Sequence, residues 1–171
     1  MIIGIAGASR SGKTTLAEQI YESLLTKNCR IIKQDDFVFP KQKLPRIGEE
    51  LDWEHPAGID FGRLRQAILG SKEEYTIVEG FLLFYQNDLV QLFDKKIFIE
   101  IDKPTFLERK NLDSRWGSVT QKYIEHVWSS YLLYGIPNPT HIDLRISGKK
   151  VMDHIPVILK SIQEYENKGE G

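Results

Sequence analysis

Short apolar runs alternate along the chain with longer segments that show helical spacing. The runs are brief, rich in β-branched residues and bounded by residues that break regular structure, a pattern typical of β-strands. Five strands are predicted: "MIIGIA" at 1–6, "CRIIK" at 29–33, "YTIVE" at 75–79, "KKIFIEI" at 95–101 and "HIDLRI" at 141–146.

Apolar residues also recur three or four positions apart, as they do on one face of a helix. The clearest sets are Leu16, Ile20 and Leu24 after the first strand, and Ile155, Leu159 and Ile162 near the C-terminus. Strands separated by helices pair in parallel with right-handed crossovers. We therefore predict an α/β fold, a doubly wound sheet of five parallel strands flanked by helices. Ligands of such sheets bind beyond the carboxyl ends of the strands.

The length of 171 residues and the hydrophobic content of 41% suit one compact domain over residues 1–171. Residues 37–60 are rich in Pro, Gly and charge, yet strands continue after them. We interpret this segment as a long surface excursion, of the kind that often binds substrate.

Charge and cysteine content narrow the class of protein. A formal net charge of −1 provides no overall basic field for nucleic acid, whereas a small anionic ligand remains compatible. Cys29 is the only cysteine, which excludes an intramolecular disulfide and fits a reducing cytoplasm. No apolar run approaches the roughly 18 residues of a membrane span, and no basic leader opens the chain, so we expect a cytoplasmic protein without a membrane partner. The sequence leaves the oligomeric state open.

A phosphate-binding motif follows the first strand. The segment "GASRSGKT" matches G-x-x-x-x-G-K-[ST], the P-loop, at the strand-to-helix junction that the motif requires. Gly7 and Gly12 permit backbone angles that turn successive N–H groups toward phosphate oxygens. Lys13 is expected to reach the β- and γ-phosphates of ATP, and Thr14 to offer its hydroxyl to Mg²⁺. The ATP-binding residues predicted from this motif are Gly7, Ala8, Ser9, Arg10, Ser11, Gly12, Lys13, Thr14 and Thr15.

Carboxylates follow two other strands. Asp35 and Asp36 come directly after a strand that we expect to end at Gln34, and Glu79 ends the third strand. Because successive strand residues point oppositely, at most one aspartate aims at the transferring phosphoryl group, where it can accept a proton from an attacking hydroxyl. The alternatives are a helix N-cap for the aspartates and a solvated strand end for Glu79. We predict that Mg²⁺ is held by Thr14, Asp35 and Glu79.

Four segments together carry a family resemblance. "GASRSGKTT", "QDDF", "VEGFLLF" and "HVW", in this order and at compatible separations, resemble the nicotinamide riboside kinases and their relatives, the uridine kinases, over about residues 1–150. "QDDF" followed by "EGFLLF" is much more specific than the P-loop, which many unrelated NTPases share. The resemblance implies a P-loop kinase fold with a small lid, and an ATP-dependent phosphotransferase that acts on the 5′-hydroxyl of a riboside.

The resemblance also assigns roles in the acceptor site. By it, Asp35 is the general base, and "DWEHPAGID" looks like the ribose-binding stretch of these kinases. Glu54 stands there where the relatives commonly have Asp, and accepts hydrogen bonds from the ribose hydroxyls. The substrate-binding residues implied in this way are Asp35, Asp36, Phe39, Trp53, Glu54, His55 and Lys110.

The nucleobase side of this site departs from the relatives. They continue "QDDF" with a second aromatic and a lysine, where this chain has Val38, Phe39 and Pro40. By resemblance Trp53, together with Phe39, packs against the base, although core packing would also explain Trp53. A flat aromatic face favours a cationic pyridinium over a neutral pyrimidine. We therefore expect nicotinamide riboside, giving nicotinamide mononucleotide and so NAD biosynthesis, ahead of uridine, cytidine or another small alcohol.

A basic segment, "ERKNLDSR", corresponds by resemblance to a lid at roughly residues 109–118. Arginines near the γ-phosphate offset charge in the transition state, so Arg115 is predicted to be catalytic, alongside Lys13 and Asp35. Arg109 is predicted to bind ATP. A solvated helix face is the alternative for this segment.

Two further predictions concern residues after the lid. By resemblance, Gly148 and Lys149 border the adenine and so bind ATP. His126 and Trp128 are expected to pack rather than to catalyse.

Other classes of nucleotide-binding protein fit the sequence less well. A signalling GTPase needs an Asn-Lys-x-Asp sequence, which the chain lacks. The tripeptide "DFG" at 60–62 is found in protein kinases, but no H-R-D-type loop accompanies it. A non-catalytic ATP-binding regulator stays open, although it has no need of Asp35, Glu79 and a basic lid together.

Overall fold

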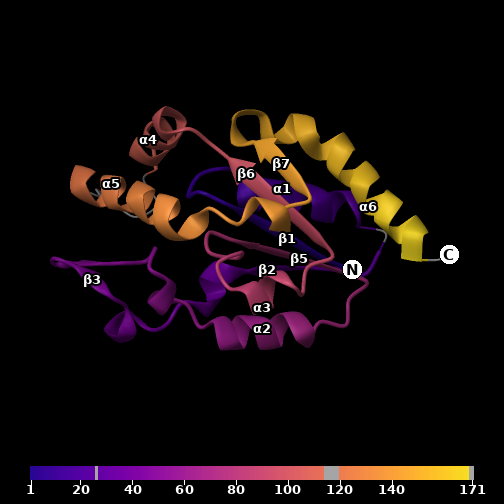
Figure 1. Cartoon of the computed structure of the whole chain (residues 1–171), viewed down its shortest axis with the longest axis horizontal. Helices are drawn as coiled ribbons and strands as arrows, with labels where there is room; N and C mark the ends of the chain where they lie inside the picture. Colours follow the sequence, from indigo (N-terminus) through magenta and orange to yellow (C-terminus); the bar gives the residue numbers. More distant parts are fainter. Residues whose placement is uncertain (26, 114–119, 170–171) are drawn as a thin grey trace.

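Five parallel strands form the central sheet of the computed structural model, which describes residues 1–25, 27–113 and 120–169 (Figure 1). Every neighbouring pair is parallel, and the spatial order β2-β5-β1-β6-β7 is that of a doubly wound sheet, as predicted. The strands are β1 (Ile2–Gly7), β2 (Cys29–Lys33), β5 (Tyr75–Gly80), β6 (Lys95–Glu100) and β7 (Leu144–Ser147).

Helices cover both faces of the sheet. One face carries α1 (Lys13–Ser23) and α6 (Ile155–Gly169), which follows a 3₁₀ segment at Gly148–His154. The other face packs against the remaining helices, namely α2 (Phe61–Leu69), α3 (Asn87–Val90), α4 (Lys103–Asn111) and α5 (Gln121–Ser130). A π-helical turn, Tyr131–Gly135, continues α5, and a 3₁₀ turn lies at Pro139–His141.

Strand residues alternate between the two cores, as the period of a strand requires. On β1, Ile3 and Ile5 are fully buried against the α1 side. On β5, Ile77 joins that core and Val78 joins the opposite one. Glu79 therefore points to the same side as α1, the helix that begins at the P-loop.

The predicted helical faces need one adjustment. Leu16, Ile20 and Leu24 are all buried, as expected. In α6 the buried stripe runs through Ile158 and Ile162, at the i, i+4 spacing of a helix face. Ile155 and Leu159 lie partly exposed at the margin of this stripe. The apolar face is thus centred on a position that the sequence pattern did not include.

Residues 34–60 hold more local structure than the sequence indicates. β2 ends at Lys33, and Gln34 begins a 3₁₀ turn at Gln34–Phe37, so the prediction that the strand ends at Gln34 is wrong. A small antiparallel hairpin follows, with Gly48 in the left-handed region (φ 61°) at its turn. The elements of the excursion are 3₁₀ turns at Lys41–Lys43 and Pro56–Gly58, with β3 (Arg46–Ile47) and β4 (Glu50–Leu51) between them.

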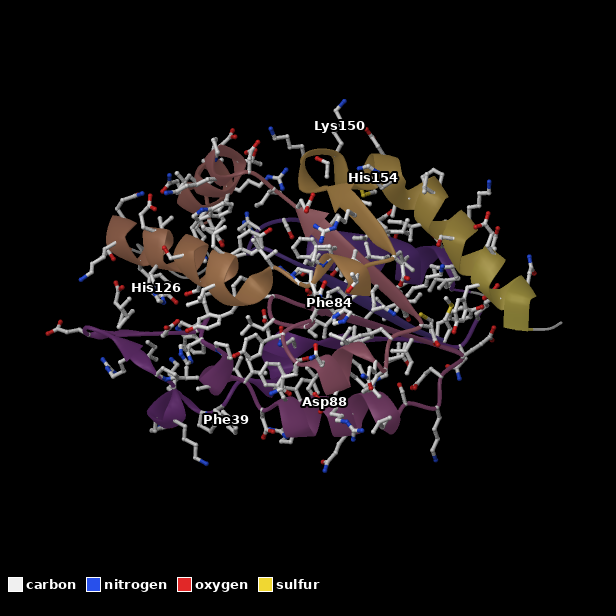
Figure 2. The ribbon with its side chains drawn as sticks, viewed as in Figure 1. Phe39, Phe84, Asp88, His126, Lys150 and His154 are labelled. Carbon is white, nitrogen blue, oxygen red and sulfur yellow. The ribbon has the colours of Figure 1, made fainter. Side chains whose placement is uncertain are left out.

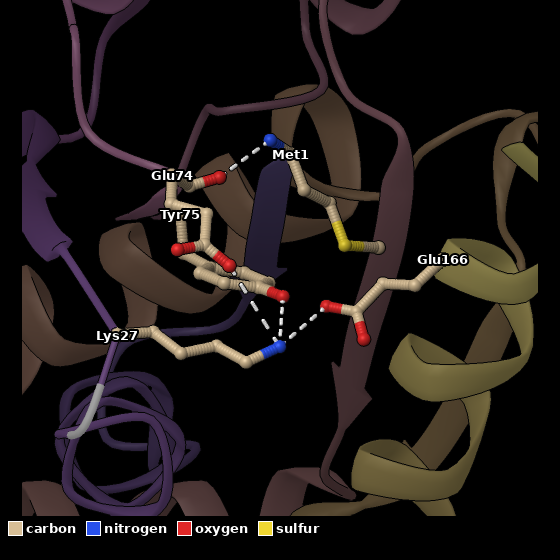
Figure 3. Close-up of polar contacts among 5 residues, drawn as sticks. All are labelled: Met1, Lys27, Glu74, Tyr75 and Glu166. Atoms are coloured by element: carbon tan, nitrogen blue, oxygen red, sulfur yellow. Dashed lines mark hydrogen bonds and ion pairs between the residues drawn. The ribbon is translucent and has the colours of Figure 1, made fainter. Parts of the chain in front are cut away.

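The two ends of the sheet differ in what surrounds them. Figure 1 shows α4, α5 and β3 beyond the end toward which the strands run, and the N-terminus and the last turns of α6 at the opposite end. Figure 3 shows how this amino end is closed: Lys27 Nζ donates to the Tyr75 hydroxyl and to Glu166 Oε1 (3.1 Å). The Met1 ammonium donates to the carbonyl of Glu74 (2.7 Å). No helix within the described residues has the length and apolarity to span a membrane.

Candidate active site

The P-loop is shaped by glycines at close contacts. Gly12 precedes α1 with a left-handed φ of 102°, which a residue with a Cβ rarely adopts. At Gly7, a Cβ would lie 2.5 Å from the Ile99 carbonyl oxygen and 2.8 Å from Ser11 Oγ. Inside the loop, the Lys13 ammonium donates to the Ala8 carbonyl at 2.9 Å. The positive charge therefore lies across the mouth of the loop, at the start of a helix whose N–H groups favour anions.

A pair of oxygens at this loop fits Mg²⁺. Thr14 Oγ1 donates to Glu79 Oε1 at 2.8 Å, because the alternation along β5 brings Glu79 to the α1 side. Mg²⁺ prefers oxygen ligands, and in phosphate-transferring sites it takes only one or two from carboxylates, with water and phosphate supplying the rest. No cluster of three or more His, Cys, Asp and Glu side chains that could hold a metal ion occurs in the described part of the chain.

The 3₁₀ turn after β2 separates the two aspartates. Successive side chains on a 3₁₀ helix are about 120° apart, and only Asp35 lines the pocket described below. Lys33, rather than either aspartate, occupies the N-cap position of this turn. Neighbouring Gln34 is buried, and its Oε1 accepts a hydrogen bond from the Leu82 N–H at 2.9 Å. One aspartate of the pair thus lines the pocket, and a 3₁₀ turn rather than the strand alternation invoked for the pair separates the two side chains.

One pocket of about 880 Å³ at the carboxyl end of the sheet brings most of the predicted residues together. Its walls come from the P-loop, the 3₁₀ turn, the excursion, the end of β5 and helix α4. The predicted site residues that line it are Ser9, Arg10, Gly12, Lys13, Thr14, Thr15, Asp35, Trp53, Glu54, Glu79, Arg109 and Lys110. We call this cavity the site pocket.

Glu54 has the most strongly perturbed carboxyl group in the site pocket. Burial raises the pKa of Glu54 to about 7, and the charges of Asp35 and Asp52 act in the same direction. The ammonium groups of Lys110 and Lys13 oppose this rise. Glu54 is therefore a carboxyl group that changes charge near neutral pH. The charges of Lys13, the phosphate-binding lysine, and of Asp35 both act on it.

A smaller cavity of about 480 Å³ adjoins the site pocket and shares Gly12, Thr15 and Arg109 with it. The Arg109 guanidinium joins the two, since it donates to the carbonyls of Arg10 (3.0 Å) and Gly148 (2.9 Å). Arg10 itself has a left-handed φ of 64°. Gly148 and Lys149, predicted to border the adenine, line this second cavity.

Three predicted substrate residues, Asp36, Phe39 and His55, are not among the described residues that line the site pocket. Val38 bridges Ile59 and faces the pocket, so the next residue, Phe39, points away, with its ring near Lys43 Nζ (Figure 2). His55 caps a 3₁₀ turn, where its Nδ1 accepts from the Ala57 N–H. Arg115 and half of the predicted lid, residues 114–118, lie outside the described residues.

Several lining residues were missed from the sequence. Tyr123 reaches the site pocket from α5, and burial and the Glu54 charge raise its pKa well above the usual range. The others include Gln34, Lys41 and Glu50. Gln34 had a sequence signal, its place directly before Asp35. Tyr123 and Glu50 had none, because their positions depend on how α5 and the hairpin pack together.

Comparison with known proteins identifies kinases of nucleosides as relatives, in agreement with the family resemblance found in the sequence. No family model matches the chain. It is 26% identical to uridine-cytidine kinase 2-B of Danio rerio, over 98% of this chain and 81% of that protein. It is 29% identical to nicotinamide riboside kinase 1 of Homo sapiens, over 78% of this chain and 75% of that protein.

Solved structures share the fold. A possible uridine kinase from Bacillus stearothermophilus superposes with a TM-score of 0.63 at 21% identity, over 85% of this chain and 88% of that one. A shikimate kinase from Bacteroides thetaiotaomicron superposes with a TM-score of 0.64 at 12% identity, over 95% and 98%. These structures confirm the predicted fold. The sequence relatives, which are kinases of nucleosides, agree with the predicted enzyme class, a phosphotransferase with an alcohol group as acceptor. The chain is similar in sequence to uridine-cytidine kinases and nicotinamide riboside kinases, and its fold is that of a P-loop kinase.

Proposed function

We propose that this protein transfers the γ-phosphoryl group of ATP to the 5′-hydroxyl of a riboside. The observation that carries the proposal is the convergence of Lys13, Asp35, Glu54 and Glu79 on one pocket. This set combines a phosphate-binding lysine, a candidate base, a candidate ribose-binding carboxylate and a candidate metal ligand. A non-catalytic ATP-binding protein has no use for the acceptor side of this pocket.

Asp35 is the proposed general base. Its carboxylate takes the proton of the 5′-hydroxyl as the oxygen forms a bond to the γ-phosphorus, and the bond from that phosphorus to the bridging oxygen breaks to release ADP. Transfer of this kind depends on positioning and charge neutralisation more than on covalent chemistry. The exposed position of Asp35 on the pocket wall suits a group that must meet an incoming hydroxyl.

Phosphate binding falls to the P-loop. Lys13 would exchange its hydrogen bond with the Ala8 carbonyl for one with the phosphates, and Arg109 already holds the loop through the Arg10 carbonyl. Thr14 and Glu79 would hold Mg²⁺, which neutralises charge on the β- and γ-phosphate oxygens. Gly148 and Lys149 would border the adenine in the smaller cavity, and Arg115 would approach the γ-phosphate from a lid at about residues 109–118.

The acceptor proposed first is nicotinamide riboside. Trp53, Glu54 and Glu50 all line the site pocket, and an aromatic face together with carboxylates suits a cationic pyridinium. Uridine or cytidine is the second candidate. It is favoured by the extent of the match to the uridine-cytidine kinase, which spans 98% of this chain against 78% for the nicotinamide riboside kinase.

A panel of acceptors tests the proposal. ADP release is measured with ATP and Mg²⁺ in the presence of nicotinamide riboside, uridine, cytidine, adenosine, pantothenate or shikimate. We expect a riboside to give the highest rate, and excess EDTA to abolish it. Equal ADP release with and without every alcohol would favour a non-catalytic regulator, and the best rate with shikimate or pantothenate would reject the riboside assignment.

A further inference from the structure

One face of α5 contacts the segment that carries Glu54. Thr120, Tyr123 and His126 are spaced three residues apart and so lie on the same side of the helix. The segment they meet is residues 50–54, which we call the acceptor segment. Two contacts join the two: Thr120 Oγ1 donates to Glu50 Oε1 (3.1 Å), and His126 Nε2 lies 2.9 Å from Asp52 Oδ2.

Asp52 is the buried centre of this contact. Asp52 is 5% exposed, and its two carboxylate oxygens contact different partners. Oδ2 faces His126, while Oδ1 accepts a hydrogen bond from the backbone N–H of Glu54 at 3.1 Å. The Asp52 N–H donates to the Pro45 carbonyl at 2.8 Å, which ties the same residue to the hairpin. A single carboxylate thus links the helix to the backbone of the proposed ribose-binding residue.

The charged neighbours of Glu54 make its carboxylate sensitive to small changes in position. Lys110 and Lys13 attract its carboxylate, and Asp35 and Asp52 repel it. A small shift of the backbone at Glu54 would therefore change which of these groups its side chain approaches. Asp52 opposes such a shift only while its own orientation is held, and within the described part of the chain His126 is the side chain that the structure pairs with Asp52 Oδ2. Figure 2 shows His126 on the side of α5 that faces the β3–β4 region.

We infer that His126 is a positioning residue for the acceptor: through Asp52 it fixes the backbone that carries Glu54 toward the ribose. The inference rests on the proposed function and adds to it a residue that contacts neither substrate. It adds a positioning role to the expectation that His126 packs rather than catalyses. Because Asp52 belongs to the acceptor segment and the phosphates are bound by the P-loop, loss of His126 should weaken the acceptor side and leave the ATP side intact.

The test compares two substitutions at His126 in the full chain. His126→Ala removes the partner of Asp52, whereas His126→Gln keeps an N–H donor at similar reach. For each variant, KM is measured for ATP and for nicotinamide riboside and uridine, and kcat/KM is compared with that of the matching 2′-deoxyribosides. We expect His126→Ala to raise the riboside KM about five- to tenfold and to lower the ribo/deoxyribo ratio by a similar factor, since a hydrogen bond to a charged group is partly lost.

Controls separate positioning from loss of fold. His126→Gln should recover most of the ribo/deoxyribo ratio, and Ser129→Ala, which removes an exposed hydroxyl bonded within the same helix to the Glu125 carbonyl, should leave it unchanged. If circular dichroism shows that His126→Ala does not fold, the Asp52→Asn variant is used to test the inference instead. Its Oδ1 can still accept from the Glu54 N–H, while the negative charge facing His126 is removed, and the same fall in the ratio is expected.

Each other outcome counts against the inference. An unchanged ribo/deoxyribo ratio in the folded variant would overturn it. So would an equal rise in KM for ATP and riboside, because a merely structural role moves both. If the wild-type protein phosphorylates no riboside, the proposed function is rejected, and the inference is rejected with it. This outcome is recognised from the wild type alone, without any variant.

Discussion

The two ends of the central sheet use charge in different ways. At the amino end, the Lys27 ammonium is shared by Tyr75 and Glu166, so that these groups satisfy one another (Figure 3). At the carboxyl end, Ser11 Oγ and Gln34 Nε2 are buried without a hydrogen-bond partner among the described residues. There, too, the pKa of Glu54 is raised to about 7.

The difference indicates what each end is for. Paired charges at the periphery contribute modestly to stability and need no further partner. Buried polar groups left unpaired are unfavourable, and in native structures they concentrate where a ligand or a reaction completes them. The carboxyl end thus has the features of a ligand-binding site, whereas the amino end contributes to stability. Substitutions at the two ends should separate activity from stability.

The largest effect is expected at Asp35. Asp35→Asn keeps the shape of the side chain and removes its basicity, so kcat should fall by about 10²- to 10⁴-fold, the usual cost of losing a general base, while ATP binding persists. Lys13→Ala should lower turnover comparably and also weaken ATP binding. Steady-state kinetics and nucleotide titration measure both.

Asp36→Asn is the matched control for the base. Asp36 is adjacent in sequence but absent from the described pocket lining, so its variant should retain near-native kcat. A severe loss in Asp36→Asn with little loss in Asp35→Asn would reverse the assignment within the pair.

A smaller effect, confined to acceptor choice, is expected at Glu54. A carboxylate that accepts two ribose hydroxyls loses about 1–3 kcal/mol when one hydroxyl is missing, because a lone pair is left unpaired. Glu54→Gln should erase much of the preference of the wild type for ribosides over 2′-deoxyribosides. Glu49→Gln, an exposed change in the hairpin that precedes Glu54, is the control. Equal preference in wild type and Glu54→Gln would remove Glu54 from the ribose site.

The pH dependence of acceptor binding should follow the pKa of Glu54. Between pH 8 and pH 6 the ionised fraction of a group with a pKa of about 7 falls about tenfold, and the riboside KM should rise accordingly. Stability should change in the opposite sense. The folded pKa lies above the ordinary value of 4.5, so the contribution of this group to the free energy of unfolding is present below about pH 4.5 and is lost as pH rises through about 7.

Glu54→Gln provides the control for both pH profiles, since its amide does not titrate. The riboside KM of this variant should no longer show the step near pH 7. A step of full size in Glu54→Gln would assign the titration to another group.

The smallest effect is expected at the amino end. Lys27→Met breaks the contacts with Tyr75 and Glu166, but the Lys27 side chain is 38% exposed, so the loss should not exceed about 1 kcal/mol. The melting temperature should therefore fall by a few degrees at most. Turnover should stay within twofold of the wild type. A large loss of kcat with little change in melting temperature would contradict the division of roles between the two ends.

The strands, the P-loop and the place of Glu79 could be predicted from the sequence because each depends on local pattern. Strand periodicity puts Ile77 and Glu79 on one side, and the P-loop puts Thr14 at the start of the helix on that side. The acceptor site could be predicted only in part. Whether Asp36, Phe39 and His55 face the pocket depends on a 3₁₀ turn, on the Val38–Ile59 bridge and on a capping bond.

Contacts between segments that are distant in the sequence could not be predicted from the sequence pattern. His126 meets Asp52, and Tyr123 meets the pocket that Trp53 also lines, across about 70 residues of chain. Neither contact has a local sequence signature, because each is set by the packing of α5 against the hairpin. For the same reason the sequence indicated for His126 only that it packs rather than catalyses.

The most direct test of a phosphotransfer site at the carboxyl end is ³¹P NMR of the reaction products. The wild type and Asp35→Asn are each incubated with ATP, Mg²⁺ and either nicotinamide riboside or uridine. The account predicts that the wild type converts ATP to ADP with an equal amount of a riboside 5′-monophosphate, and that Asp35→Asn does so at least about 10²-fold more slowly. ADP accompanied only by inorganic phosphate, or equal rates for the two proteins, would contradict it.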